Sequence, residues 1–233
     1  MLDTLAQLFD PGLFWEYRTI LLAGAAVTLY VFAFAAVLAV VLGLVACLLR
    51  LSAWRGLRWI GTFYAELCRN TPEYVLLIWI HYVPPLVLTW LTGVRVNFVP
   101  VVSAVLALGL ASSGYFTETF RAGILAVPRG HVEAARSLAM SRGLTLRRII
   151  LPQAVRRMLP EAMNQFISLF KATTLVSLIS VTDLMYQVSI ITQEQMRPLP
   201  LYSGTAFLYF GVIFAMSVSV RRFTEQWRRR GWA

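Results

Sequence analysis

Charged side chains are scarce in this sequence. Only 14% of its 233 residues are Asp, Glu, Lys or Arg, whereas 58% are hydrophobic. A soluble domain carries about 25% charged residues, so this composition does not fit a soluble fold. A helix that crosses a bilayer needs roughly 20 apolar residues, and the chain has room for about five or six such helices. The composition predicts an all-α integral membrane protein.

Lysine and cysteine are almost missing. Lys171 is the only lysine among 21 basic residues, and the net charge is +10. The arginines lie in the short segments between apolar runs, as the positive-inside rule describes, and not on one soluble face. We therefore expect no nucleic-acid partner. Cys47 and Cys68 lie in apolar surroundings without a paired spacing, which predicts two buried thiols rather than a disulfide or a metal site.

The groups that catalysis needs are missing too. No G-x-x-x-x-G-K-S/T segment occurs, so we expect no ATP site on this chain. No cluster of His, Cys and Asp suggests a metal site, and no nucleophile lies beside a base. We expect a membrane subunit that is not an enzyme and that holds no cofactor of its own.

Apolar runs predict five membrane spans, at about residues 20–49, 57–90, 98–120, 160–181 and 202–220. Pro72 interrupts the second run and predicts a kink, because proline lacks an N–H and disfavours a helical residue before it. Pro84 and Pro85 are expected to end that helix near the far interface, and the fourth span is expected to begin near Pro160.

Arginine placement predicts the orientation of these spans. Three arginine-rich segments, at 50–58, 129–157 and 221–230, fall on one side, and the other side holds only Arg18, Arg95 and Arg197. The N-terminus is therefore expected outside and the C-terminus in the cytoplasm. We expect an external segment at 1–19, one transmembrane domain at 20–222 and a basic cytoplasmic tail at 223–233.

A polar insert separates the third and fourth spans. Residues 133–152 read EAARSLAMSRGLTLRRIILP and include four arginines. This stretch is too polar to lie in lipid, and its pattern is too regular for a flexible linker. It predicts a short helical element on one side of the membrane that docks onto another protein. The alternative is a surface helix that merely follows the positive-inside rule.

The same insert resembles the EAA loop of permease subunits in ATP-binding-cassette (ABC) importers. That pattern runs EAA, three residues, Gly, nine residues, then I-x-L-P. The matching residues are Glu133, Ala134, Ala135, Ile149, Leu151 and Pro152. Ala139 stands where the family usually has glycine, which is expected to weaken the turn between the two helices of the loop.

Four further segments resemble polar amino-acid permeases of this class. They are GAAVTL at 24–29, ELCRNTP at 66–72, SSGYFTETFRAGI at 112–124 and NQFISLFKATTLVSLISVTDL at 164–184. Asn70, Thr174 and Asp183 replace the usual Gly, Ser and Glu. Because the resemblance covers nearly all of residues 20–222, the chain is identified as a member of the polar amino-acid ABC uptake permeases.

The resemblance implies a type I importer permease in the bacterial inner membrane. It implies pairing with a second permease subunit, identical or paralogous, two ATPase subunits that bind ATP and Mg, and a periplasmic or extracellular solute-binding protein. It also implies that the coupling loop, residues 128–157, forms two short helices, the first of which lodges in a cleft of the ATPase. Glu133 is expected near the positive start of that helix, and Ala134 and Ala135 are expected to let the backbone approach closely.

Ionisable and polar residues within or beside the spans form a second candidate site. An isolated charge in the bilayer costs at least ~2.5–3.5 kcal/mol, so such groups face protein or water, or pair. One interpretation is a path for a zwitterionic solute. The other is structural pairing, which we favour for Glu118 with Arg121 at i,i+3. The candidate path residues are Glu66, Arg69, Asn70, Thr71, Glu118, Lys171, Thr173 and Thr174.

Several alternatives stay open at this point. Within the family, the solute could be an opine, a cystine-like or an ectoine-like compound instead of a common polar amino acid. In a different class, the chain could be an ATP-independent secondary transporter, which would be expected to show internal inverted repeats; none is evident. Five glycines within the spans are expected to serve close helix packing, namely Gly61, Gly109, Gly114, Gly123 and Gly211.

Overall fold

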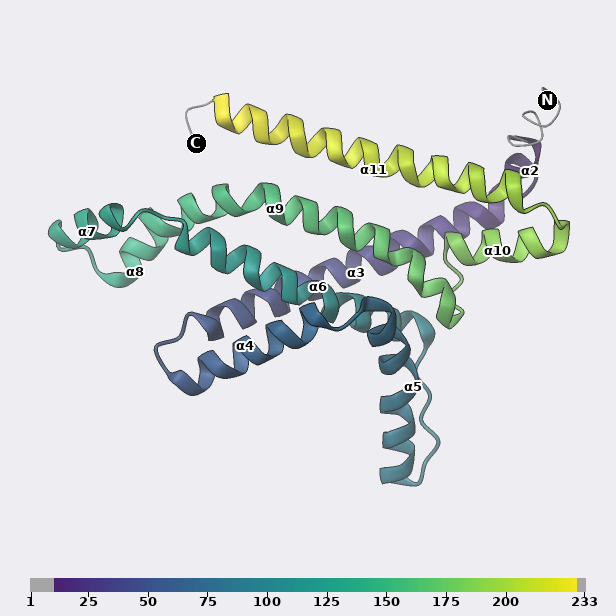
Figure 1. The fold of residues 1–233 in the computed structure, drawn as a ribbon, viewed down its shortest axis with the longest axis horizontal. Helices are drawn as coiled ribbons and strands as arrows, with labels where there is room; N and C mark the ends of the chain where they lie inside the picture. Colours follow the sequence, from purple (N-terminus) through teal and green to yellow (C-terminus); the bar gives the residue numbers. More distant parts are fainter. Residues whose placement is uncertain (1–10, 230–233) are drawn as a thin grey trace. The chain divides into compact units, whose positions relative to one another are not determined.

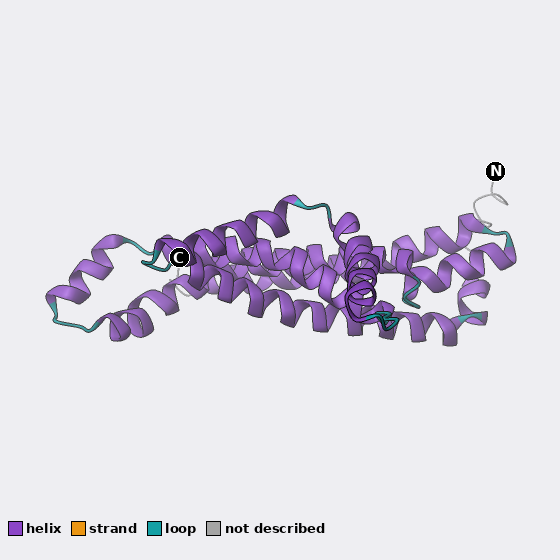
Figure 2. Ribbon diagram, turned by 90° about the horizontal axis from the view of Figure 1, so that it is seen from below, coloured by secondary structure: helices purple, strands orange, loops and turns teal. Residues whose placement is uncertain are grey.

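A computed structural model of the chain describes residues 11–229, and every regular element in that range is a helix (Figures 1 and 2). This result confirms the all-α prediction. Five helical segments are long and apolar enough to cross a membrane, which confirms the predicted number of spans. They are Arg18–Arg50, Glu73–Thr92, Pro100–Leu125, Arg142–Ile179 and Pro198–Glu225.

The helices follow one another closely along the described chain. The first five are α2 (Pro11–Glu16), α3 (Arg18–Arg50), α4 (Arg55–Asn70), α5 (Glu73–Thr92) and α6 (Pro100–Leu125). After α7 (Arg129–Ser137) and α8 (Arg142–Thr145), a π-helical turn, η1 (Leu146–Ile150), leads into α9 (Leu151–Ala172). The last three are the 3₁₀ segment η2 (Thr173–Ile179), α10 (Leu184–Gln195) and α11 (Pro198–Arg229).

Pro72 produces a complete break and not a kink. Thr71, which precedes it, is extended at φ −88° and ψ 125°, as a residue before proline prefers. The second span is therefore Glu73–Thr92 alone, and the predicted span at 57–90 was wrong in including α4.

The other prolines behave in the opposite way, and the predicted helix ends were wrong. Pro84 and Pro85 lie inside α5, which continues to Thr92, and Pro160 lies inside α9 instead of starting it. A proline inside a helix loses one hydrogen bond, whereas a helix that ends in lipid leaves several backbone groups without water. Continuing the helix is therefore the less costly outcome.

The C-terminal boundary also differs from the prediction. α11 runs unbroken from Pro198 to Arg229, so residues 223–229 extend the last helix, and the fifth span is longer than 202–220. α10 was not predicted as a separate helix. Residues 1–10 and 230–233, parts of the predicted external segment and basic tail, lie outside the described residues.

The described chain divides into two compact units. The first unit comprises the described residues up to Ala35, with Glu73–Leu108 and Leu169–Val218. The second unit comprises Ala36–Pro72, Gly109–Ser168 and the described residues from Ser219 onward. The helices α3, α6, α9 and α11 each contribute one end to each unit.

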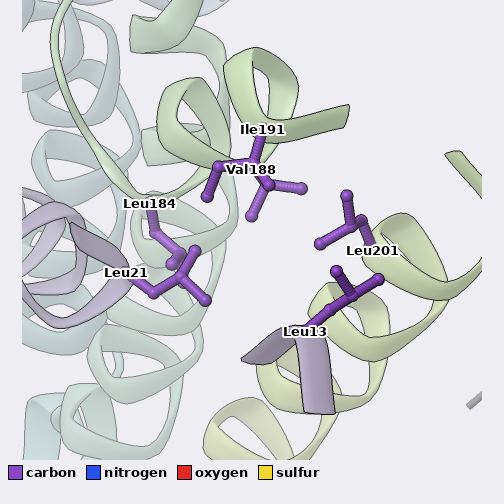
Figure 3. Close-up of a cluster of buried hydrophobic side chains, with 6 residues drawn as sticks. All are labelled: Leu13, Leu21, Leu184, Val188, Ile191 and Leu201. Carbon is purple, nitrogen blue, oxygen red and sulfur yellow. The ribbon is translucent and has the colours of Figure 1, made fainter. Parts of the chain in front are cut away.

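The first unit has a core built from α2, α3, α10 and α11. Its buried side chains, shown in Figure 3, are Leu13, Leu21, Leu184, Val188, Ile191 and Leu201. The hydroxyl of Tyr17 accepts a hydrogen bond from the Gln195 side chain at 2.6 Å, which ties the start of this core to the end of α10.

The start of α10 is held against α3 at one point. A Cβ on Gly24 would lie 3.0 Å from both the Asp183 carbonyl oxygen and Leu184 Cα, so only glycine fits there. One turn further along α3, Thr28 Oγ1 accepts a hydrogen bond from the Leu184 amide at 3.1 Å. This contact joins GAAVTL (24–29) to the last residues of the segment 164–184.

The Asp183 side chain caps the same helix. Its two oxygens accept hydrogen bonds from the amides of Met185 and Tyr186 at 3.3 and 3.0 Å, which satisfies backbone donors in the first turn of α10. Burial raises the pKa of Asp183 to about 6, and these amide hydrogen bonds oppose that rise. Asp183 therefore has a structural role that the sequence did not reveal.

We expect Gly24→Ala to destabilise the first unit. The added methyl would meet backbone atoms at 3.0 Å that cannot rotate away, and overpacking of this kind costs about 1–3 kcal/mol. Thermal unfolding in detergent measures the effect. Gly211→Ala is the matched control, because no atom lies within 4 Å of its added Cβ and alanine favours the helix. Equal unfolding temperatures for the two variants would contradict the close contact at Gly24.

Candidate coupling surface and polar cluster

The second unit holds α7, α8 and η1, which together we call the coupling hairpin (residues 129–150). Figure 1 shows the hairpin beyond the adjoining ends of α6 and α9. These two helices are locked together at its base. A Cβ on Gly123 would lie 2.7 Å from Met158 Cβ, and the Arg157 guanidinium donates to the Ala126 carbonyl. The hairpin therefore leaves from a fixed support.

The hairpin is packed within itself. α7 contacts both α8 and η1, and each side of the hairpin contributes one buried residue, Ala135 and Thr145. Ser141 accepts a hydrogen bond from the Leu144 amide and so caps α8. The predicted pair of short helices joined near residue 139 is confirmed.

Ala139 closes α7 in a left-handed conformation, with φ at +53°. The Ala139 amide bonds to the Arg136 carbonyl at 2.9 Å, and the Met140 amide bonds to the Ala135 carbonyl at 3.1 Å. These are the two hydrogen bonds of a Schellman motif, which usually places glycine at this position. The family's glycine is therefore explained by backbone conformation, and alanine is strained here.

The structure places the predicted coupling residues as follows. Glu133, Ala134, Ala139, Leu151 and Pro152 are exposed, and Ile149 is half-buried.

Two details of the coupling prediction were wrong. Ala135 is only 2% exposed, so it packs inside the hairpin and offers no surface to a partner. Glu133 lies in the second turn of α7, because α7 begins at Arg129, and the first turn contains no acidic residue. Glu133 is therefore too far along the helix to act as a first-turn acid.

Pro152 explains the π-helical turn. A proline cannot donate to the carbonyl four residues earlier, here that of Arg148, and its ring would clash with that carbonyl in a regular helix. The chain widens instead, and the Leu151 amide bonds to the Leu146 carbonyl five residues back. Such turns are rare and often mark functional sites.

A cluster of charges surrounds Glu118 in the second unit. Its carboxylate contacts three arginines from three helices: Arg121 at 2.9 Å on the same helix, Arg69 of α4 at 3.4 Å, and Arg50 at the end of α3. The predicted pairing of Glu118 with Arg121 is confirmed. The part played by Arg50 was missed, because 68 residues separate it from Glu118 in the sequence.

Glu66 belongs to the same cluster. Its carboxylate lies 3.7 Å from Arg69 and accepts a hydrogen bond from the Asn70 side chain at 2.9 Å. The Thr71 hydroxyl donates to the Leu67 carbonyl at 2.7 Å. Three arginines thus share two carboxylates in this cluster, which leaves it with a net positive charge.

Glycines allow the helices of this cluster to approach closely. Cβ atoms on Gly61 and Gly114 would meet side-chain atoms of Leu49 and Arg69 at 2.8 Å, and one on Gly123 would meet Met158. Gly109 meets Leu38 in the same way. The predicted packing role is confirmed for these four glycines and wrong for Gly211, which has no atom within 4 Å of a built Cβ.

Lys171, Thr173 and Thr174 lie in the first unit, where α9 gives way to η2. Thr173 is fully buried and donates to the Phe170 carbonyl at 2.7 Å, while Thr174 donates to the Lys171 carbonyl at 2.9 Å. The Lys171 side chain is exposed, and no described residue pairs with its ammonium group. The candidate path residues therefore fall into one group in each unit.

Comparison with known proteins identifies the family. The model of the binding-protein-dependent transport system inner membrane component matches residues 39–229. The histidine/lysine/arginine/ornithine permease HisQ of Salmonella typhimurium is 34% identical over 205 residues, which cover 85% of this chain and 90% of HisQ. The L-cystine permease TcyB of Bacillus subtilis is 37% identical, covering 76% of this chain and 74% of TcyB.

Solved structures agree with these relatives. An amino acid ABC transporter crystallised with histidines superposes with a TM-score of 0.84 at 31% identity, covering 93% of this chain and 98% of that one. An inward-facing MetNI methionine transporter gives a TM-score of 0.68 at 18% identity, covering 89% and 97%, and supports the fold alone. The chain belongs to the family of binding-protein-dependent transport system inner membrane components, the permease subunits of ABC importers.

Proposed function

We propose that this permease carries a polar amino acid across the bacterial inner membrane after a solute-binding protein delivers it. The names of its relatives support this solute class, because they include cationic amino acids. An opine, a cystine-like or an ectoine-like solute is the alternative within the same family, and an L-cystine permease is among the relatives. A second permease subunit would complete the pathway, and two ATPase subunits carrying ATP and Mg would supply the energy.

The coupling hairpin is the observation that carries this proposal. α7 presents Glu133 and Ala134 outward, is closed by a Schellman motif, and is supported by Ala135 from within. At Ala134 the exposed side chain is only a methyl group, so the helix can approach a groove closely at this position. We propose that the exposed face of α7 seats in the ATPase and that Ile149, Leu151 and Pro152 hold the second half of the hairpin in position.

The orientation belongs to the same proposal. Residues 128–157 contain seven arginines and one acidic residue, Glu133. The positive-inside rule places such a segment in the cytoplasm, where an ATPase would meet it. The N-terminus would then lie outside and the C-terminus inside.

The solute path is proposed from charge. The Glu118 cluster has one more positive than negative charge, and the side chains of Arg69 and Glu66 are 34% and 46% exposed. Lys171 supplies a second cation without a partner among the described residues. Within the second unit, the cluster's arginines would face the carboxylate of a zwitterionic solute, and Glu66 with Asn70 and Thr71 would face its ammonium group. In the first unit, Lys171 would offer a separate contact to a solute carboxylate. Thr173, being buried and bonded to the Phe170 carbonyl, would hold the junction of α9 and η2 instead of touching the solute, and Thr174 would hold the Lys171 backbone.

We expect Ala134→Trp to uncouple the transporter. The indole ring would occupy the space into which the ATPase must fit, and a misfit of about 1–3 kcal/mol weakens binding about five- to 150-fold. Because Ala134 is exposed, membrane insertion should stay normal. Co-purification of the ATPase and solute uptake measure the effect. Ala53→Trp, an exposed alanine in the segment between α3 and α4, is the matched control.

Wild-type ATPase binding and uptake in Ala134→Trp would show that α7 is not the docking surface. Ala135→Trp is unsuitable for this test, because it would disrupt the packing of the hairpin itself.

We expect Ala139→Gly to stabilise the hairpin. Glycine adopts φ +53° without the strain that costs alanine about 1 kcal/mol, so local opening should become about fivefold rarer. Hydrogen exchange of the Met140 amide, which bonds to the Ala135 carbonyl, reports that opening. Ala139→Val should exchange faster than wild type. Faster exchange in Ala139→Gly would contradict the strain at this position.

We expect Lys171→Gln to impair uptake at full protein abundance. Loss of one charge contact to a solute carboxylate should lower uptake at low solute concentration about tenfold, while ATPase co-purification is retained. Lys171→Arg keeps the charge and should retain most of the uptake. Normal uptake in Lys171→Gln would exclude a role for Lys171 in solute recognition.

A further inference from the structure

Two adjacent arginines on the coupling hairpin have no partner. Arg147 and Arg148 are exposed, and no described residue bonds to either side chain. Four arginines of the second unit, by contrast, are engaged. Glu118 contacts Arg50, Arg69 and Arg121, and the Ala126 carbonyl accepts from Arg157. Arg147 and Arg148 are therefore available to an external anion.

The π-helical turn reduces the angle about the helix axis between these two side chains. Its hydrogen bonds join residues five apart, so it holds more residues per turn than an α-helix, and consecutive side chains diverge by a smaller angle. Two guanidinium groups can then reach one anionic group. The turn depends on Pro152 and is thus a fixed feature of the backbone.

Exposed apolar side chains flank the pair. Leu144, Leu146, Leu151 and Val155 are 39, 44, 41 and 38% exposed. Arginine beside exposed leucine is typical of a membrane interface, where the apolar part enters the acyl region and the guanidinium meets headgroup phosphate. The helical segment Arg142–Ile179 is a candidate membrane span by length and composition, and Arg147 and Arg148 lie near its start.

We propose that Arg147 and Arg148 form a binding site for the headgroup of an anionic phospholipid. The occupant is a lipid and not an acidic protein surface, because the arginines adjoin exposed leucines at the end of a span. The only acidic residue of the coupling loop, Glu133, lies on α7 and does not compete for them. The site would anchor the base of the hairpin to the membrane surface. It goes beyond the proposed transport role and does not require a bound ATPase.

The test measures lipid selection by the full chain without its ATPase. The permease is purified in mixed micelles of phosphatidylglycerol and phosphatidylcholine, and native mass spectrometry gives the ratio of the two bound lipids. We expect Arg147→Gln with Arg148→Gln to lower phosphatidylglycerol enrichment about fivefold for each arginine, the equivalent of about 1 kcal/mol each. Arg147→Lys with Arg148→Lys keeps both charges and should keep the enrichment.

The matched control is Arg221→Gln with Arg222→Gln, an exposed basic pair of the same charge on α11. It should change the enrichment far less. An equal loss in the control would show a general charge effect and overturn the site, and so would unchanged enrichment in the Gln variant or lost enrichment in the Lys variant. A further outcome would also overturn the lipid site. If the Gln variant selected lipids normally but no longer co-purified with the ATPase in phosphatidylcholine alone, the ATPase would be the occupant.

Discussion

The close approach of α6 and α9 at Gly123 supports the coupling hairpin. At that point a side chain would collide with Met158, and three residues later the Ala126 carbonyl receives the Arg157 guanidinium. The proposed coupling role requires a hairpin that leaves from helices which do not slide past each other. Without this contact, the Schellman turn and the buried Ala135 would hold the hairpin together but would not fix its direction.

The charge cluster around Glu118 also depends on helices that approach closely at glycines. Charges are costly beside lipid unless they are paired, and one carboxylate here serves arginines from the ends of α3 and α4 and from α6. The glycines of α4 and α6 permit the close packing that brings these groups into contact. Structural pairing and a residual positive charge are therefore present together, and solute recognition can use the second without losing the first.

Sequence reasoning succeeded where one local rule was sufficient. Apolar length predicted five spans, and the EAA pattern located a two-helix hairpin. It failed where local rules competed. Pro72 broke a helix, whereas Pro84, Pro85 and Pro160 did not, because the outcome depends on which neighbours satisfy the freed backbone groups. Ala135 was predicted to face a partner, and the structure buries it, because the folding of the hairpin back on α7 cannot be read from spacing.

The sequence alone determined the class of this protein, its span number and the place of the two-helix hairpin, because composition and short-range motifs are properties of consecutive residues. Only the tertiary structure decided which groups meet across long separations. The Arg50 guanidinium bonds to the Glu118 carboxylate, and the Leu184 amide donates to the Thr28 hydroxyl across 156 residues. It also showed why glycine is favoured at position 139, and that no described residue pairs with Arg147 or Arg148. Those outcomes depend on backbone conformation and on distances between helices, which the order of residues does not display.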